Sequence, residues 1–339
     1  MREFTINKND AGQRLDKFIQ KTVKGIPTSL MYKSIRTKKI KVNRKRAELN
    51  QMLALGDTVQ MFLNEDLFSE KITKNELVSV EAKINVVYED ENILICDKAP
   101  GILVHSGDGD GKESGKGDAS ERNTLIYHVQ SYLAKKGEYD PQNENSFTPS
   151  LCNRIDRNTG GMVICAKNAE ALRTVNERIK NNQISKFYLC ATHGVPRKKE
   201  DTLTGFLRKD STKNQVTVSK TPIPGGKNII TKYRVLRVAK GNALLEVELV
   251  TGRTHQIRAH LSYIGYPLLG DGKYGVNREE RSKGYKYQAL YAYRLAFDPT
   301  EEENELSYLE GKSFSIPLED VWFLRDFPQN GEKTRGNGA

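Results

Sequence analysis

Paired apolar stretches separated by turn residues recur between positions 84 and 250, and this pattern constrains the fold more than any other feature of the sequence. Residues 84–88 and 93–96 flank four polar residues, while residues 233–238 and 243–250 flank a Lys-Gly-Asn turn. Strands that are joined by such short turns pair in the antiparallel sense. The pattern therefore predicts a mainly antiparallel β-sheet.

Helical signals are fewer in this region. Residues 186–192 alternate between apolar and polar side chains, as a further strand would. Leu172, Val175 and Ile179 instead recur at helical spacing, after a helix start near Asn168. Strand pairs that dominate over scattered helices predict a mixed α+β fold.

Composition shifts along the chain divide it into parts. We expect a small α/β domain over residues 1–70, a polar linker over residues 71–83 and a large α+β domain over residues 84–328. Residues 107–120 are rich in Gly and Ser, which predicts a surface loop. Residues 329–339 are expected to form a disordered tail.

The small domain carries a strongly basic stretch. Residues 33–46 contain eight Lys or Arg and no acid. Before this stretch, residues 15–19 carry apolar side chains at helical spacing, and residues 39–43 alternate as a half-buried strand does. A solvated surface is one explanation for the charge. The absence of interleaved acids between ordered elements favours an anion-binding surface.

The formal net charge of +11 favours a polyanionic partner and leaves RNA, DNA and acidic membranes open. No apolar run approaches the roughly 20 residues that span a bilayer, and the N-terminal residues lack the apolar core of a signal peptide. The four cysteines lie in apolar, strand-like stretches without a C-x-x-C pair. Buried reduced thiols are therefore expected rather than zinc ligands or disulfides, and the predicted location is cytoplasmic.

Two segments combine charged side chains with glycine turns. Lys98-Ala99-Pro100-Gly101 joins two apolar strands, and taken alone it fits a structural turn as well as a functional one. The second segment, residues 153–161, reads N-R-I-D-R-N-T-G-G. Asp156 lies between Arg154 and Arg157, and two nearby cations favour its ionised form. Such a carboxylate suits nucleophile or base chemistry, whereas an isolated R-x-D-R is better explained as a surface ion-pair cluster.

The chain contains a comparison for this motif in its first domain. Arg14-Leu15-Asp16 has the same Arg-apolar-Asp spacing, on an amphipathic helix and without a glycine turn. We interpret that copy as structural.

A third segment, residues 251–261, reads T-G-R-T-H-Q-I-R-A-H-L and follows a strand. Thr254 can cap a helix there, which leaves Arg253 at the strand–helix junction, where it could hold an anion. His255 and His260 are separated by about 140° of helical rotation, so they do not form a metal-binding pair. No metal is expected, and at least one of these histidines should make structural hydrogen bonds.

These three segments, in this order, resemble the signature of the RluA family of pseudouridine synthases. The family pattern T-G-R-T-H-Q-I-R-x-H is matched at every position of residues 251–260. Residues 186–191 resemble its K-x-Y-x-A strand, and residues 269–275 resemble its G-D-x-x-Y-G turn. The basic N-terminal module resembles the small RNA-binding domain shared with ribosomal small-subunit protein four.

The sequence departs from the family pattern at four positions. Asn153 replaces a histidine, Ile155 a leucine and Gly160 a serine, and Tyr291 stands where a histidine is often found. None of these changes removes a group that the reaction needs, although substrate preference could differ.

The resemblance implies an isomerase that breaks the glycosidic bond of uridine, rotates the uracil and rejoins it through carbon 5, without a cofactor. Asp156 would be its catalytic carboxylate, either attacking the sugar or removing a sugar proton. A single carboxylate fits this reaction better than hydrolysis, for which glycosidases use two. Arg253 would pair with Asp156, and Tyr188 would stack on the uracil and assist proton removal at carbon 5.

Further roles concern substrate binding. Arg154 would fill the gap left when the uridine is flipped from its stack. Ile257 and Leu261 would line the base, with ordinary core packing as the alternative. Phosphate contacts are assigned to the basic stretch, chiefly Lys38, Lys39, Lys41, Arg44 and Lys45.

The expected partner is large-subunit ribosomal RNA, with transfer RNA as the alternative target and a monomer as the default state. Three rivals remain at this point: an inactive RNA-binding or ribosome-assembly protein, a glycosylase that releases uracil, and a membrane-surface protein. The last is the weakest, because no continuous amphipathic helix surrounds the basic stretch.

Overall fold

The computed structural model describes residues 1–23, 25–68, 72–105, 122–210, 215–275 and 284–328. The expected loop over residues 107–120 and the expected tail over residues 329–339 lie outside the described residues. None of the helices in the described part of the chain combines the length and the apolar character that crossing a bilayer requires.

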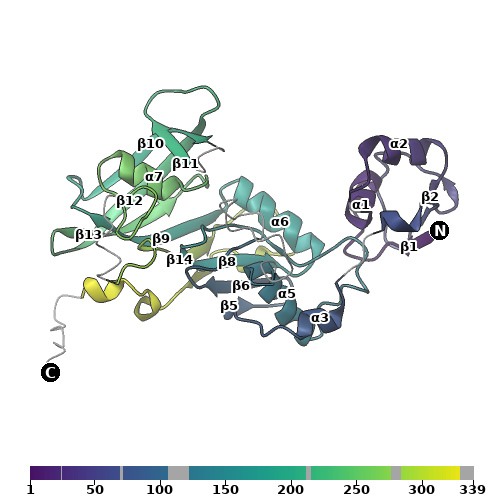
Figure 1. Cartoon of the computed structure of the whole chain (residues 1–339), viewed down its shortest axis with the longest axis horizontal. Coiled ribbons are helices and arrows are strands. Elements are labelled where there is room, and N and C mark those ends of the chain that lie inside the picture. Colours follow the sequence, from purple (N-terminus) through teal and green to yellow (C-terminus); the bar gives the residue numbers. More distant parts are fainter. Residues whose placement is uncertain (24, 69–71, 106–121, 211–214, 276–283, 329–339) are drawn as a thin grey trace.

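The N-terminal elements form a small lobe of their own (Figure 1). Its sheet has the strand order β1-β4-β2-β3, comprising β1 (Arg2–Thr5), β2 (Ile40–Val42), β3 (Lys45–Arg46) and β4 (Thr58–Met61). Two helices, α1 (Leu15–Thr22) and α2 (Thr28–Arg36), accompany it, and the 3₁₀-helix η1 (Glu65–Leu67) follows it. Apolar side chains from α1, α2 and the strands form one core cluster. The expected helix and strand are confirmed, whereas α2 was not anticipated.

The Arg-apolar-Asp copy in this lobe is structural, as interpreted. Arg14 Nε and Nη2 donate to Oδ1 and Oδ2 of Asp16 at 3.1 and 2.7 Å, at the N-terminal end of α1. Asp16 is 6% exposed, so this carboxylate is held against the lobe rather than presented to a ligand.

The large domain is built on a sheet of 11 strands within the described residues. The main path runs β11-β10-β12-β13-β9-β14-β8-β6-β5, with β15 paired to β14 and β7 paired to β8. Its strands are β5 (Asn85–Glu89), β6 (Ile93–Lys98), β7 (Ser150–Leu151), β8 (Gly160–Ala166), β9 (Ile184–His193), β10 (Glu200–Asp210), β11 (Gln215–Ser219), β12 (Lys227–Ala239), β13 (Asn242–Leu249), β14 (Leu290–Phe297) and β15 (Ser313–Ser315). The pairings are antiparallel except that of β14 with β8. The predicted mixed α+β class with a mainly antiparallel sheet is confirmed.

Side chains from the strands of this sheet enter two large core clusters, and a third, smaller cluster involves β10, β11 and β12. The helices α3 (Lys74–Val78), α5 (Leu125–Lys135) and α7 (Gln256–Tyr263) contribute to one cluster. Helix α6 (Ala169–Lys180) and residues in and next to the C-terminal 3₁₀-helices contribute to the other large cluster, and Figure 1 shows α6 across β8 from α3 and α5. The 3₁₀-helices are η4 (Ser307–Leu309), η5 (Leu318–Asp320) and η6 (Leu324–Asp326).

Local predictions agree with these elements in detail. Helix α6 begins after Asn168, whose side chain accepts a hydrogen bond from the backbone N–H of Ala171 at 2.8 Å. The β12–β13 hairpin turns at Lys240 and Gly241, both with positive φ, as a type I′ turn requires. The described cysteines are free thiols, and three of the four are buried.

The segment expected to be a linker contains an ordered helix. Thr73 and Glu76 form a capping box at the start of α3, and Leu77 is fully buried in the core of the large domain. Leu77 is surrounded mostly by polar residues in the sequence, so no apolar periodicity indicated that this segment packs against the core. Residues 72–83 therefore belong in part to the large domain rather than forming a free connection.

Candidate active site

Asp156 lies on the turn between β7 and β8. The backbone N–H of Thr159 donates to the Asp156 carbonyl at 3.0 Å and closes the turn. The Thr159 hydroxyl accepts from Nε2 of Gln288 at 3.0 Å, and both side chains are buried. The Asp156 side chain is 24% exposed. Its carboxylate is thus fixed at the backbone and still reachable from solvent.

The two glycines after this turn are required by close strand packing. A Cβ on Gly160 would lie 2.4 Å from the ring of Tyr291, and one on Gly161 would lie 2.3 Å from the carbonyl oxygen of Ala292. Gly161 also has a φ of +114°, which L side chains rarely adopt. These positions pair β8 with β14, so the glycines bring the Asp156 turn to an interior strand of the sheet.

Arg258 in the first turn of α7 holds Asp156. Its Nη1 donates to Oδ2 of Asp156 at 2.7 Å, while Nε and Nη2 donate to Oδ2 and Oδ1 of Asp271 at 2.7 and 2.9 Å. The planar guanidinium suits this arrangement because its donors point in fixed directions. Asp271 has no exposed side-chain surface, so Arg258 is fixed from within the protein.

The expectation that Arg253 pairs with Asp156 was wrong. Arg253 is exposed before α7, where its backbone N–H donates to Oε1 of Gln256 at 3.1 Å. No role was predicted for Arg258, although it belongs to the same matched segment. One signal could have identified it: Arg258 precedes Leu261 by three residues, and such residues share a helix face.

The charges in this cluster support one another. Burial alone would lower the pKa of Arg258, but the hydrogen bonds and charges of Asp271 and Asp156 raise this pKa above its usual value. Burial would raise the pKa of Asp271, yet Arg258 and two backbone N–H groups lower it. Arg258 and Asp271 therefore remain charged at neutral pH.

Tyr188 and the apolar residues assigned to the base share one core cluster. Tyr188, on β9, is 5% exposed, and its pKa is raised first by burial and then by the charge of Asp156. Ile257 is 4% exposed and lies in the same cluster. Leu261 has no exposed surface, so its position is that of an ordinary core residue. Arg154 is exposed, two residues before Asp156 on the same turn.

Lys98 ties the Pro-Gly turn to the Asp156 turn. Its Nζ donates to the carbonyl oxygens of Ala99, Ile102 and Arg157 at 3.1, 3.0 and 2.9 Å. The N–H of Gly101 also donates to the Arg157 carbonyl, at 2.8 Å. Lys98 is 1% exposed, and burial lowers its pKa to about 7 against the opposing charge of Asp156. The turn therefore serves the structure by joining two segments of the site.

The entry to α7 differs from its prediction. His255, with a φ of 54°, is the N-cap residue in place of Thr254, and it makes no side-chain cap. Gln256 organises the entry instead, because Oε1 accepts from the Arg253 N–H and Nε2 donates to the Ile230 carbonyl at 3.0 Å. Both histidines make hydrogen bonds: His255 Nδ1 with the Tyr274 hydroxyl and His260 Nδ1 with the Thr231 hydroxyl.

The basic stretch lies at the surface of the N-terminal lobe, around β2 and β3. Four of the five lysines and arginines assigned to phosphate contacts are exposed, and Lys41 is half-buried. The Lys41 Nζ lies 5.5 Å from the centre of the Phe62 ring, and Phe62 is 43% exposed. The β2–β3 turn places Asn43 and Arg44 in the left-handed region, with φ of 50° and 63°.

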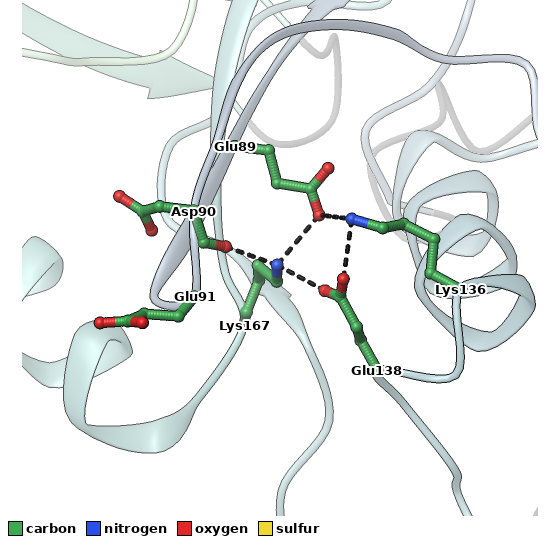
Figure 2. Close-up of a pocket in the computed structure, with 6 residues that line it drawn as sticks. All are labelled: Glu89, Asp90, Glu91, Lys136, Glu138 and Lys167. Carbon is green, nitrogen blue, oxygen red and sulfur yellow. Dashed lines mark hydrogen bonds and ion pairs between the residues drawn. The ribbon is translucent and has the colours of Figure 1, made fainter.

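A separate cavity of about 520 Å³ has a lining that does not include Asp156 (Figure 2). Its side chains are charged and largely paired with one another. Lys136 contacts Glu89 and Glu138, both at 2.7 Å, and Lys167 contacts Glu89 at 2.9 Å. This network joins β5, α5 and the end of β8. The residues that line the cavity are all acidic or lysine, and none has an aromatic ring on which a base could stack, so it is not the candidate site.

The family model described as RNA pseudouridylate synthase matches residues 92–263. The chain is 32% identical over 275 residues to ribosomal large subunit pseudouridine synthase C of Buchnera aphidicola, covering 80% of each chain. It is 31% identical over 334 residues to an uncharacterised RNA pseudouridine synthase of Mycoplasma genitalium, covering 95% of this chain and 97% of that one.

Solved structures show the same fold. The human protein RNA pseudouridylate synthase domain containing 4 matches with a TM-score of 0.54 and 22% identity, covering 75% of this chain and 96% of the other. Human RNA pseudouridylate synthase domain containing 1 matches with a TM-score of 0.51 and 18% identity, covering 71% and 94%.

Proposed function

The chain belongs to the RNA pseudouridylate synthase family, and we propose that it converts uridine to pseudouridine in large-subunit ribosomal RNA, with Asp156 as its catalytic carboxylate. The observation that carries the proposal is the position of Asp156. This partly exposed carboxylate lies on a glycine turn that leads into an interior strand of the sheet, and it is held by a buried arginine.

The contacts of Asp156 leave one oxygen for chemistry. Arg258 binds Oδ2, and Oδ1 has no hydrogen-bond partner among the described residues. Asp271 binds the other side of the guanidinium and fixes Arg258, so Arg258 can hold the Asp156 carboxylate in one orientation. In this geometry Oδ1 either attacks carbon 1′ of the ribose or accepts a proton from the sugar.

Tyr188 is proposed to stack on the uracil. Its buried position beside Asp156 raises its pKa, so the hydroxyl keeps its proton at neutral pH. Any help with proton removal at carbon 5 therefore requires Tyr188 to hand its own proton on. Arg154 is exposed next to the catalytic turn, where it could occupy the space left by the flipped uridine.

The choice of RNA rests on two supports. Relatives named ribosomal large subunit pseudouridine synthase C are about 30% identical to this chain over most of its length. The N-terminal lobe presents a cluster of exposed Lys and Arg that suits a phosphate backbone. We assign the phosphate contacts to this lobe and propose that it is an RNA-binding domain of the ribosomal small-subunit protein four type.

The test is Asp156→Asn, which removes the charge and keeps the shape. We expect loss of pseudouridine formation in a large-subunit ribosomal RNA transcript, while the affinity for that transcript stays within about twofold of wild type, because surface phosphate contacts dominate binding. Release of free uracil by the wild type would support a glycosylase instead. Pseudouridine formation by Asp156→Asn at the wild-type rate would overturn the assignment.

Mapping pseudouridines in total RNA identifies the target. The expected result is loss of one or more pseudouridines from large-subunit ribosomal RNA in cells that lack the protein. Loss from transfer RNA alone would contradict the proposed target and leave the proposed chemistry intact.

A further inference from the structure

We propose that Tyr274 holds His255 in the neutral form that carries its proton on Nε2, so that this ring presents an N–H donor to RNA oxygen atoms at the mouth of the Asp156 site. The RNA contact rests on the proposed function. The state of the ring rests only on contacts within the protein.

A hydrogen-bonded chain leads from β11 to the start of α7. The backbone N–H of Val216 donates to the Tyr274 hydroxyl oxygen at 2.9 Å. The same oxygen lies 2.9 Å from Nδ1 of His255, and the two rings meet edge to face with centroids 5.6 Å apart. The phenol of Tyr274 thus connects the β10–β11 hairpin to the residue that precedes α7.

The direction of the second bond follows from the first. A phenol has one O–H, and here its oxygen already accepts a hydrogen bond from Val216. Among the described residues, Nδ1 of His255 is the acceptor within reach of that O–H. Leaving a half-buried donor unsatisfied would cost free energy, so Tyr274 donates and Nδ1 carries no proton. A neutral imidazole with a bare Nδ1 carries its proton on Nε2.

The ring is neutral because its surroundings oppose a positive charge. Burial lowers the pKa of His255 to about 4, and this effect outweighs the opposing charge of Asp156. Arg258 and Lys273 also lower this pKa, whereas Asp271 raises it. At pH 7 the ring is therefore a neutral donor at Nε2.

Tyr274 itself is held by the elements that hold the catalytic ion pair. Its backbone N–H donates to Oδ1 of Asp271 at 3.1 Å, and its carbonyl accepts from the Ser262 hydroxyl at 3.0 Å. The guanidinium carbon of Arg258 lies 5.2 Å from the centre of its ring. Asp271 thus anchors both Arg258 and Tyr274, so the two side chains keep a constant relation to Asp156.

His255 has the free end that a ligand contact requires. Its Nε2 makes no hydrogen bond with any of the described residues. This atom is also not one of the described side-chain atoms that are buried without a partner, so a ligand can reach it. The residue lies three positions before Arg258, and Asp156 is among the charges that act on its ring. An N–H donor at this place fits a phosphate or ribose oxygen of the nucleotides that flank the target uridine.

The first experiment reads the tautomer directly in the free, full-length protein labelled with ¹⁵N-histidine. At pH 7 we expect a pyrrole-type nitrogen shift for Nε2 of His255 and a pyridine-type shift for Nδ1. In Tyr274→Phe the donor is lost, so the two tautomers should mix. His260 serves as an internal control, because Nδ1 of this ring bonds Thr231 and its signals should not change. A proton on Nδ1 of His255 in the wild type would overturn the proposal.

The second experiment tests the RNA contact with a large-subunit ribosomal RNA transcript. His255→Asn suits the left-handed backbone but does not reach the Nε2 position, and we expect the Kd to rise about 3- to 10-fold when one hydrogen bond is removed. His255→Gln carries an amide N–H near that position and should restore at least half of the missing affinity. Thermal melting of both variants identifies any folding defect.

Equal Kd values for the wild type and both variants would overturn the RNA contact. Absence of pseudouridine formation by the wild type would instead overturn the proposed function and leave the tautomer measurement valid.

Discussion

At the scale of single residues, the site depends on one arginine shared by two carboxylates. Arg258 binds Asp156 at the surface side and Asp271 in the interior. Removing one partner of a buried ion pair leaves an uncompensated charge, which costs more than the pair itself contributes. The fully buried Asp271 makes Arg258 important for stability as well as for the position of Asp156.

Arg258→Met should therefore be severely destabilising. We expect the free energy of unfolding to fall by about 3–5 kcal/mol, because the Asp271 carboxylate stays buried without its partner. Urea denaturation at pH 7 measures the change, and pseudouridine formation should be abolished in the same variant. The matched control is Arg253→Met, which alters an exposed arginine of the same segment and should change stability by no more than about 0.5 kcal/mol. Equal losses of stability in the two variants would contradict the assigned pairing.

At the scale of elements, the site is assembled where three connections meet. The end of β6, the turn between β7 and β8, and the first turn of α7 supply Lys98, Asp156 and Arg258. Lys98 joins the first two through three backbone carbonyls. An ammonium group has three N–H donors, so only the charged form satisfies all three acceptors, but burial outweighs this preference and lowers the pKa of Lys98.

Burial of this lysine predicts a specific dependence of stability on pH. The pKa of Lys98 is about 7 in the folded chain against an ordinary value of 10.5. Between these values the unfolded chain holds more protons, so the free energy of unfolding rises with pH, by up to about 1.4 kcal/mol per unit. Lys98→Met lacks this contribution. The difference in unfolding free energy, wild type minus variant, should therefore increase from about pH 7.5 to about pH 9.5 in urea denaturation. A difference that stays constant over this window would contradict the lowered pKa.

At the scale of the whole molecule, a basic lobe is docked onto the large domain. Asp10 is fully buried and accepts hydrogen bonds from the Ser146 hydroxyl at 2.6 Å and from Nδ2 of Asn145 at 2.7 Å. Asn9 adds hydrogen bonds with Glu144 and with the backbone N–H of Ala169. These polar interactions fix where the lobe presents its positive charge relative to the large domain.

Neutralising the basic stretch should flatten the salt dependence of RNA binding. Glutamine replaces five residues in one variant, namely Lys38, Lys39, Lys41, Arg44 and Lys45. Each lost contact between a Lys or Arg side chain and a phosphate should make the slope of log affinity against log salt concentration less steep by roughly one unit. Titration of a ribosomal RNA transcript at several salt concentrations measures this slope. The single variant Lys39→Gln should also lower the slope, and Lys198→Gln is its control. Lys198 is 69% exposed in the large domain, so its replacement removes a surface charge outside the basic stretch. An unchanged slope in the fivefold variant would exclude this stretch from the RNA footprint.

How much of the structure can be predicted from the sequence differs between these scales. Periodicity predicted α1, α6, β2 and β9, because side chains of one kind recur on one face of each element. Paired apolar stretches around turn residues predicted β5, β6 and the β12–β13 hairpin. It did not identify α2 within a run of charge, or α3 around the single buried Leu77. The parallel pairing of β8 with β14 joins positions about 130 residues apart, and local patterns contain no information on such partners.

The sequence by itself determined the chemistry available: a carboxylate on a double-glycine turn, a matched arginine- and histidine-bearing segment, and a basic N-terminal module. Only the tertiary structure decided which groups meet. Arg258 rather than Arg253 reaches Asp156, because helix α7 starts after His255 and directs Arg258 inward between two carboxylates. Side-chain direction at a strand–helix junction depends on where the helix begins, and that point is set by packing and hydrogen bonds from distant segments.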